Sequence, residues 1–509
     1  MGIVYLIGAG PGDPGLFTLR GKELLETCDV VVYDYLANDA LLALANKNAE
    51  IIYVGKQGGD HTLAQSEINR LIVARAQEGK RVARLKGGDP YMFGRGAEEA
   101  EELLEAGIPF EVVPGVTSAI AAAAHAGIPL THRAHASSVC FATGHEDPSK
   151  ASSVHNWKAL ATGTSTLVFF MGMKNLPDIV HNLTTHGMNP HTPAALVRWG
   201  TTPRHKSCAG TLAELPELAA QHGFTAPSLI IIGPVVSLRG KLNWFEKKPL
   251  LGHGIVVTRS REQASSMSAL LRQEGAEVIE FPTIAVTPLE DTSPTREALC
   301  RLREYDWVVF TSANGVAFFW REMDALGLDA RAFAATQVAA IGPATAQALA
   351  EKGIRADFVP ESFIAESALA GLVARGVRGR NILIPRAREA RDVLPQGLVD
   401  AGATCRVLPV YAAMPQDTGH DAVLHAMAEG SIRYITFASS STVTNFFRRI
   451  PQELFAAGTT IRFACIGPIT AATLREHGLT CHVMPERYTV PDLVRAILDD
   501  AATCRANEG

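Results

Sequence analysis

Residues 84–99 read Arg84-Leu-Lys-Gly-Gly-Asp-Pro-Tyr-Met-Phe-Gly-Arg-Gly-Ala-Glu-Glu99. The apolar run that leads into them, residues 81–85, predicts a strand that ends at Gly87 and Gly88. A helix is expected from about Gly96, because several glutamates occupy its first turns, where the helix dipole favours negative charge. Glycines at the carboxyl end of a strand let a ligand approach the backbone, and open α/β sheets bind small ligands at that edge.

A second loop of this kind opens the chain. Gly8 and Gly10 fit the dinucleotide fingerprint G-x-G-x-x-G, but Asp13 stands where the third glycine is required. Pro11 and Pro14 also lack the amide hydrogens that a pyrophosphate would need. The loop therefore favours a nucleoside ligand without a diphosphate over NAD.

Composition limits the classes of protein that are possible. At ~150 residues per domain, 509 residues predict three or four domains. A hydrophobic content of 47% with 19% charged residues is typical of a globular protein, and a net charge of −5 argues against nucleic-acid binding. The eight cysteines are scattered without metal-ligand spacing, which predicts reduced thiols in the cytoplasm and no metal site. No export signal and no membrane span are expected.

Short apolar strands alternate with helical patterns up to about residue 134. The expected strands are Val4–Ile7, Val30–Tyr33, Ile51–Val54, Val82–Leu85 and Phe110–Val113. Such alternation predicts a parallel sheet joined by right-handed crossovers. From 135 to 245 the apolar runs are richer in β-branched residues, which predicts a second α/β lobe with a mixed sheet. The charged, proline-containing segment 246–252 predicts a linker.

The remainder of the chain contains an internal duplication. The pattern of residues 306–319 recurs at 433–447, and that of 340–346 recurs at 465–471. Gly342 and Gly467 lie 125 positions apart, as do Pro360 and Pro485. A constant separation over this length predicts two similar α/β lobes.

The repeats place hydroxyl side chains at the starts of helices. These residues are Ser312, Thr345, Ser439 and Thr470. Helix starts carry unsatisfied amides and partial positive charge, so four of them in one cleft would bind a polycarboxylate. The simpler interpretation is that each is a helix N-cap.

Five motifs resemble uroporphyrinogen-III C-methyltransferase over residues 1–245. They are Gly8-Ala-Gly-Pro-Gly-Asp-Pro14, Val32-Tyr-Asp34, Gly55-Lys56, Gly87-Gly-Asp-Pro90 with Phe93-Gly-Arg-Gly96, and Pro114-Gly-Val-Thr-Ser118. The duplicated half resembles uroporphyrinogen-III synthase over 253–502. The resemblance implies an α/β tetrapyrrole-methylase fold of two lobes (about 1–134 and 135–245). It also implies a pair of flavodoxin-like, parallel-sheet lobes, one of 253–285 with 412–502 and one of 286–411.

The first resemblance implies a site for S-adenosylmethionine, which leaves as S-adenosylhomocysteine. The residues expected to line it are Pro11, Gly87, Gly88, Asp89, Met92, Thr117, Ser118, Met171 and Gly200. A methylated pyrrole must lose a proton, and the resemblance makes Asp34 the acceptor and Lys56 the donor or charge partner. Glu98 is a rival base, and the sequence leaves that choice open. Arg95 and Arg133 are expected to clamp substrate carboxylates.

The second resemblance implies closure of hydroxymethylbilane without a cofactor. Tyr411 is the candidate acid for the departing hydroxyl, and its alternative is an aromatic residue at a strand end. The whole chain is then a bifunctional enzyme that makes uroporphyrinogen III with ring D inverted and methylates it at carbons 2 and 7 to precorrin-2, for sirohaem or cobalamin. A homodimer through the methyltransferase half is implied. Two rival interpretations are a non-catalytic tetrapyrrole-binding C-terminal module and a nucleotide-dependent oxidoreductase, and Pro11 and Asp13 argue against the latter.

Overall fold

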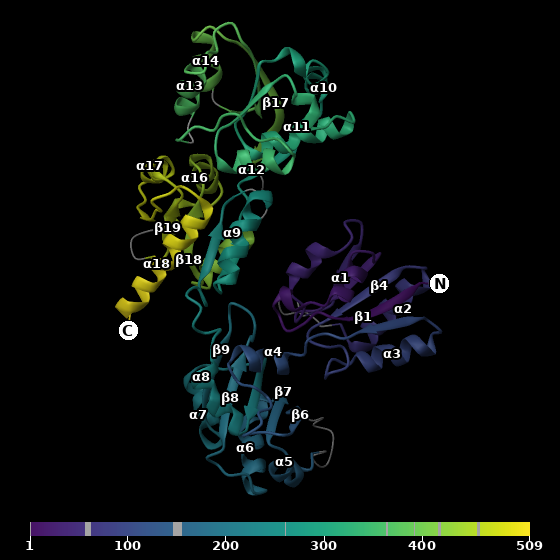
Figure 1. Ribbon diagram of the computed structural model, residues 1–509. Helices are drawn as coiled ribbons and strands as arrows, with labels where there is room; N and C mark the ends of the chain where they lie inside the picture. The colour runs from purple at the N-terminus through teal and green to yellow at the C-terminus, as the bar shows by residue number, and fades with distance from the viewer. Residues whose placement is uncertain are drawn as a thin grey trace. The chain divides into compact units, whose positions relative to one another are not determined.

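A computed structural model describes residues 2–55, 63–145, 155–259, 261–362, 365–390, 392–415, 419–455 and 459–508. The chain forms two compact units (Figure 1). Unit 1 comprises Met1–Ile255, Ala269–Val278 and Ile497–Gly509, and unit 2 comprises Val256–Ser268 and Ile279–Ala496. Unit 1 contains two complete five-stranded sheets, and unit 2 contains a third and most of a fourth, so the chain has four α/β lobes.

The first lobe of unit 1 is built on a parallel sheet in the order β3-β2-β4-β1-β5. Its strands are β1 (Ile3–Gly8), β2 (Val30–Tyr33), β3 (Glu50–Tyr53), β4 (Arg81–Lys86) and β5 (Phe110–Val113). Its helices are α1 (Leu19–Leu25), α2 (Gln65–Gln77), α3 (Gly96–Glu105) and α4 (Ser118–His125). The prediction of a parallel sheet is confirmed. Apolar side chains of β1, β2 and β4 are buried against α2 and α3. Because the strands are parallel, their carboxyl ends meet at one edge of the sheet.

The second lobe is a mixed sheet in the order β6-β7-β10-β8-β9, as expected. Its strands are β6 (Val139–Thr143), β7 (Thr166–Phe170), β8 (Pro193–Arg198), β9 (Lys206–Thr211) and β10 (Ser228–Ile232). Strands β6 and β7 are parallel, and the other pairs are antiparallel. Helices α5 (Trp157–Gly163), α6 (Leu176–Thr185) and α7 (Leu215–Gln221) complete this lobe, and α8 (Arg239–Leu242) follows it.

The segment expected to link the halves, residues 246–252, is part of unit 1. Glu246 accepts hydrogen bonds from His205 at 3.0 Å, Asn243 at 2.6 Å, Arg239 at 2.6 Å and Ser207. Burial alone would raise the pKa of Glu246, but these donors lower it to about 2. The carboxylate therefore ties the start of the segment to strand β9.

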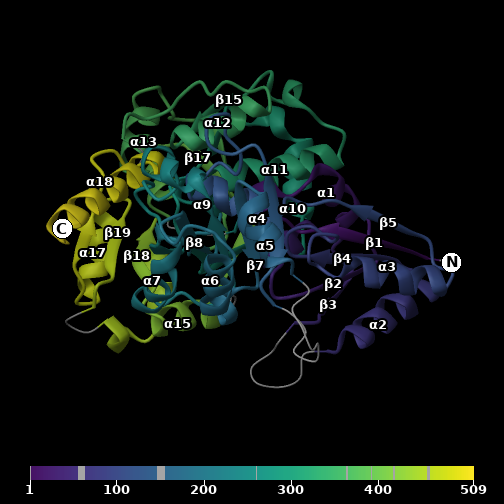
Figure 2. The ribbon, with the colours of Figure 1, turned by 90° about the horizontal axis from the view of Figure 1, so that it is seen from below.

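The outer lobe, most of which belongs to unit 2, has the sheet order β12-β11-β18-β19-β20. Its strands are β11 (Gly254–Val257), β12 (Glu277–Glu280), β18 (Ile432–Phe437), β19 (Arg462–Cys465) and β20 (Cys481–Val483). Its helices are α9 (Arg261–Gln273), α15 (His420–Ala428), α16 (Ser440–Phe447), α17 (Pro468–Glu476) and α18 (Val490–Glu508). Helix α17 lies beside β19 in two views (Figures 1 and 2).

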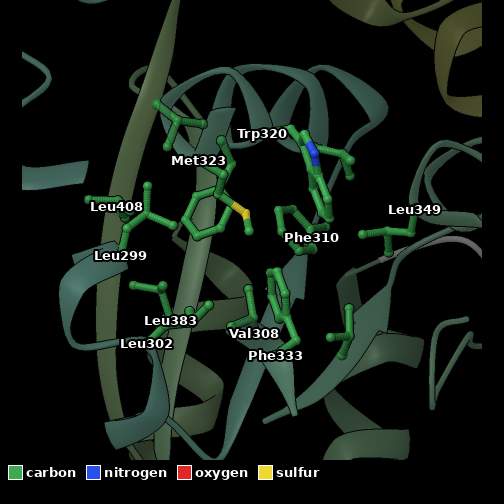
Figure 3. Packing of buried hydrophobic residues seen from close by; sticks show 14 of the residues in the cluster. Leu299, Leu302, Val308, Phe310, Trp320, Met323, Phe333, Leu349, Leu383 and Leu408 are labelled. Carbon is green, nitrogen blue, oxygen red and sulfur yellow. The ribbon is translucent and has the colours of Figure 1, made fainter. Parts of the chain in front are cut away.

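The inserted lobe has the sheet order β13-β17-β16-β14-β15. Its strands are β13 (Ile284–Pro288), β14 (Trp307–Phe310), β15 (Gln337–Ala340), β16 (Asn381–Ala387) and β17 (Thr404–Pro415). Its helices are α10 (Ser293–Cys300), α11 (Ala313–Ala325), α12 (Pro343–Glu351), α13 (Ala365–Val373) and α14 (Val393–Asp400). Side chains of β14 and α11 interlock in its core (Figure 3).

One pair in the inserted lobe departs from a purely parallel sheet. Strand β13 runs antiparallel to β17, whereas β14, β15, β16 and the first part of β17 are parallel. The physical reason lies in the connectivity, because the chain enters the lobe along β13 and leaves it along β17. Two crossings in opposite directions pair most simply as an antiparallel ribbon.

In the part of the chain that the structure describes, no helix is long and apolar enough to span a bilayer.

Candidate active site

A cavity in unit 1 has a volume of about 820 Å³ and is lined by residues of both lobes of that unit. Three glycine loops pack together at the strand ends of the first lobe. A Cβ atom on Gly8 would lie 2.5 Å from Gly115 Cα, and one on Gly115 would lie 2.2 Å from the carbonyl oxygen of Gly88. Gly10 and Gly88 also pair through their backbones, with hydrogen bonds of 2.7 and 3.2 Å. This close backbone packing requires glycine, and Gly10 and Gly88 bring it to the wall of the cavity.

Four aromatic side chains from both lobes line the cavity as two pairs, which form its aromatic rim. The Tyr35 and Trp199 rings lie 5.8 Å apart, and Phe93 and Phe170 lie 4.9 Å apart. Among the described residues, five non-glycine residues have positive φ, and they are Phe93, Arg95, Met171, Trp199 and Thr201. The first four line the cavity. Such backbone strain collects where a site is held in a fixed geometry.

The structure brings most of the expected donor-site residues to this cavity. The residues that line it are Pro11, Gly87, Gly88, Met92, Thr117, Ser118, Met171 and Gly200. Asp89 is used differently, because its carboxylate accepts the backbone amides of Tyr91 at 2.8 Å and Gly115 at 3.0 Å. It shapes the loop and is not among the lining residues.

The expected catalytic residues separate into two groups. Asp34 and Arg95 line the cavity, and Asp34 accepts hydrogen bonds from Arg84 at 2.9 Å and from the amide of Leu36 at 3.1 Å. Glu98 does not line it; a two-point contact with Arg95 lowers the pKa of Glu98. Both carboxylates are paired with an arginine, so the distinction is one of position: Asp34 lines the cavity and Glu98 does not.

Two expected residues are not part of the described site. Lys56 lies outside the residues that the structure describes. Arg133 is exposed and is not among the residues that line the cavity. Its predicted role as a carboxylate clamp therefore has no geometric support within the described cavity.

Three buried charged residues at the cavity wall were assigned no role from the sequence. Arg84 and Lys86 line the cavity from β4, and Glu99 on α3 is completely buried between them. The signal was in the helix pattern, because Glu99 falls on the buried face with Ala100 and Leu103. Spacing alone therefore separates Glu99 from its exposed neighbours on the same helix.

In unit 2, the expected residues lie at helix starts in two lobes. The Ser312 hydroxyl caps α11 by accepting the amide of Gly315 at 3.0 Å, and it lies 3.1 Å from the Tyr411 hydroxyl. Burial raises the pKa of Tyr411, so its hydroxyl keeps its proton. The Tyr411 ring also stacks on Phe318, with centroids 5.5 Å apart.

The other three hydroxyl residues differ in exposure. Ser439 caps α16 by accepting the amide of Thr442 at 3.3 Å. Thr345 and Thr470 are buried in the first turns of α12 and α17. Ser312 and Ser439 are thus N-caps, as the simpler interpretation held, and a shared cleft for all four residues stays a prediction.

Sequence comparison identifies both halves. Residues 3–216 match the family model Tetrapyrrole (Corrin/Porphyrin) Methylases, and residues 265–495 match Uroporphyrinogen-III synthase HemD. The porphyrin biosynthesis protein HemD of Ruminiclostridium josui is 39% identical over 503 residues, which cover 98% of each chain. The chain belongs to this family. It is a bifunctional tetrapyrrole biosynthesis enzyme, with a uroporphyrinogen-III C-methyltransferase half and a uroporphyrinogen-III synthase half.

Other relatives match parts of this HemD-family enzyme. The uroporphyrinogen-III C-methyltransferase of Bacillus subtilis is 42% identical over 67% of this chain and 69% of its own. A sirohaem synthase of Pseudomonas putida is 54% identical over 48% of this chain and 52% of its own. A solved uroporphyrin-III C-methyltransferase of Thermus thermophilus has 41% identity and a TM-score of 0.40, and covers 48% of this chain and 97% of its own. Another structure of that enzyme contains S-adenosyl homocysteine and has 39% identity and a TM-score of 0.40, covering 46% of this chain and 99% of its own.

Proposed function

We propose that the methyltransferase half transfers two methyl groups from S-adenosylmethionine to carbons 2 and 7 of uroporphyrinogen III, giving precorrin-2. We further propose that the synthase half closes hydroxymethylbilane with inversion of ring D. The observation that carries the first proposal is that one cavity combines a glycine wall, an aromatic rim and the Asp34 carboxylate. The domain limits proposed are 1–245, a linker at 246–252, and 253–502.

The residues at the cavity fit a bound donor. Gly87 and Gly88 present backbone without side chains, and Met171 and Thr117 offer an apolar and a hydroxyl surface in the same cavity. S-adenosylmethionine supplies an activated methyl group, so the protein has to align the two reactants and exclude water. The aromatic rim provides that exclusion.

Asp34 then has one chemical task. As the new carbon–carbon bond forms, the carbon–sulfur bond breaks and the ring carries a positive charge. Loss of a ring proton to the Asp34 carboxylate restores neutrality, and the same residue serves again for the second methyl group. Lys56 is proposed as the donor or charge partner, and Arg95 as a carboxylate clamp.

In the synthase half, Tyr411 is proposed to protonate the hydroxyl group that leaves the bilane. Its raised pKa and its contact with Ser312 support a proton held in place until the substrate is present. Ser312, Thr345, Ser439 and Thr470 are proposed to receive substrate carboxylates at helix starts.

The test supplies the purified full-length enzyme with hydroxymethylbilane and S-adenosylmethionine and follows product mass and isomer. A dimethylated type III product supports both proposals. Methylation of supplied uroporphyrinogen III, with only the type I ring formed from the bilane, would make the synthase half a tetrapyrrole-binding module. A cytoplasmic location is proposed from eight cysteines that are all free, and light scattering would test the proposed homodimer.

A further inference from the structure

A buried carboxylate gathers three donors behind the wall of the methyltransferase cavity. Glu99 Oε1 accepts hydrogen bonds from Lys86 Nζ at 2.8 Å, Gln65 Nε2 at 3.1 Å and Arg84 Nε at 3.2 Å. The Glu99 side chain is completely buried, and its second oxygen has no hydrogen-bond partner among the described residues. A buried carboxylate with this many donors on one oxygen fixes the direction of each.

Arg84 carries this constraint to the cavity. Its Nη2 donates to Asp34 Oδ2 at 2.9 Å, and its Nη1 donates to the carbonyl of Leu85 at 2.8 Å. The guanidinium is planar, so contacts at Nε, Nη1 and Nη2 leave it a single orientation. The position of the Asp34 carboxylate therefore depends on Glu99, although the two carboxylates share no direct contact.

Lys86 depends on Glu99 as well. Its side chain is only 5% exposed. Burial lowers the pKa of Lys86 most, and the positive charge of Arg84 on the same strand lowers it further. Glu99 on α3 and Asp34 after β2 act in the opposite direction, and Glu98 is the further acid nearby. A buried ammonium is stable only with its counter-charge, and Glu99 supplies that counter-charge through direct contact.

We propose that Glu99 is the positioning residue of the methyl-transfer site, which orients Asp34 through Arg84 and holds the Lys86 ammonium at the cavity wall. This inference rests on the proposed role of Asp34 as the proton acceptor. Among the acidic residues of helix α3, the proposal gives this role to the buried Glu99 and not to its half-exposed neighbour Glu98.

The decisive variant is Glu99→Gln, which keeps the shape and removes the charge. Glu102→Gln is the matched control, because Glu102 lies on the same helix, contacts Asn69 at 2.6 Å and is not among the cavity-lining residues. Both are measured in the full-length enzyme by thermal melting, by binding of S-adenosylhomocysteine, and by single-turnover methylation of uroporphyrinogen III across pH.

Glu99→Gln is expected to bind S-adenosylhomocysteine normally but to methylate roughly 10- to 100-fold more slowly, the usual effect of a misplaced reacting group. We expect the rate to fall at alkaline pH as Lys86 loses its proton. Because Glu99 raises the pKa of Lys86, the Glu99→Gln substitution should shift this alkaline limb of the rate profile to lower pH. Lys86→Arg should retain activity and lose that limb, since a guanidinium does not titrate in this range.

A Glu99→Gln enzyme that matches Glu102→Gln in rate and pH profile would overturn the inference. Lower melting with an unchanged profile would also overturn it, because that is the behaviour of a purely structural residue. Asp34→Asn is the separate test of the proposed base. A slow Asp34→Asn enzyme beside a normal Glu99→Gln enzyme refutes only the inference, whereas a fully active Asp34→Asn enzyme refutes the proposed base.

Discussion

Replacement of Gly115 by alanine should disable the methyltransferase site without unfolding it. The added Cβ would lie 2.2 Å from the Gly88 carbonyl oxygen and 2.7 Å from Gly8 Cα. Carbon–oxygen contacts normally begin at about 3.3 Å, so the loop that carries Gly88 must retreat by roughly 1 Å. Displacement of a binding loop by this amount costs about 100-fold in rate, and overpacking costs about 1–3 kcal/mol of stability.

The assay combines calorimetric binding of S-adenosylhomocysteine, single-turnover methylation and thermal melting. Gly163→Ala is the control, since a Cβ on Gly163 in the second lobe meets nothing within 4 Å. We expect Gly115→Ala to weaken binding and slow methylation, and Gly163→Ala to do neither. Equal binding and equal rates in the two variants would refute the claim that three touching backbones set the donor position.

The remaining predictions concern three other features. Glu246→Gln should lower the melting temperature most above pH 4.5, and the difference should vanish as the pH falls towards 2, because a depressed pKa stabilises the fold only while the carboxylate is ionised; a pH-independent difference would contradict this. Tyr411→Phe should slow bilane closure by about 10²- to 10⁴-fold in a stopped assay, while the lost hydrogen bond to Ser312 costs only about 1 kcal/mol of stability; a rate within twofold of wild type would exclude Tyr411 as the acid. Arg95→Gln and Glu98→Gln should each change the free energy of unfolding by less than ~1 kcal/mol, because both side chains are about half exposed. Only Arg95→Gln should raise the KM for uroporphyrinogen III, and equal KM values would exclude a clamp.

Much of the fold follows directly from apolar runs. The five predicted strands of the first lobe agree with the structure to within about one residue at each end, because buried parallel strands are continuous in hydrophobicity. Strand β9 gives no apolar run of this kind. Lys206–Thr211 is small and polar, and it forms the edge of its sheet, where neither face demands apolar residues.

The site was less predictable because the sequence does not show in which direction each side chain points. Asp89 and Glu98 are acids in the right loop and helix, but the fold turns Asp89 onto backbone amides and pairs Glu98 with Arg95 at the surface. Glu99, one position further, points inward because a helix advances 100° per residue. The roles of the individual site residues stay predictions until the variants are measured.

The insertion of one lobe within another has a consequence for synthesis on the ribosome. In the finished outer lobe, the Thr258 hydroxyl donates to the carbonyl of Thr436 at 2.7 Å, across 178 residues of chain. At 5–20 residues per second, roughly 10–35 s pass between the emergence of these two residues. The inserted lobe can complete its own sheet in that interval, while β11 waits with an unpaired edge. During that interval the unpaired edge of β11 is most exposed to wrong pairing with other nascent chains that are being synthesised on the same messenger RNA.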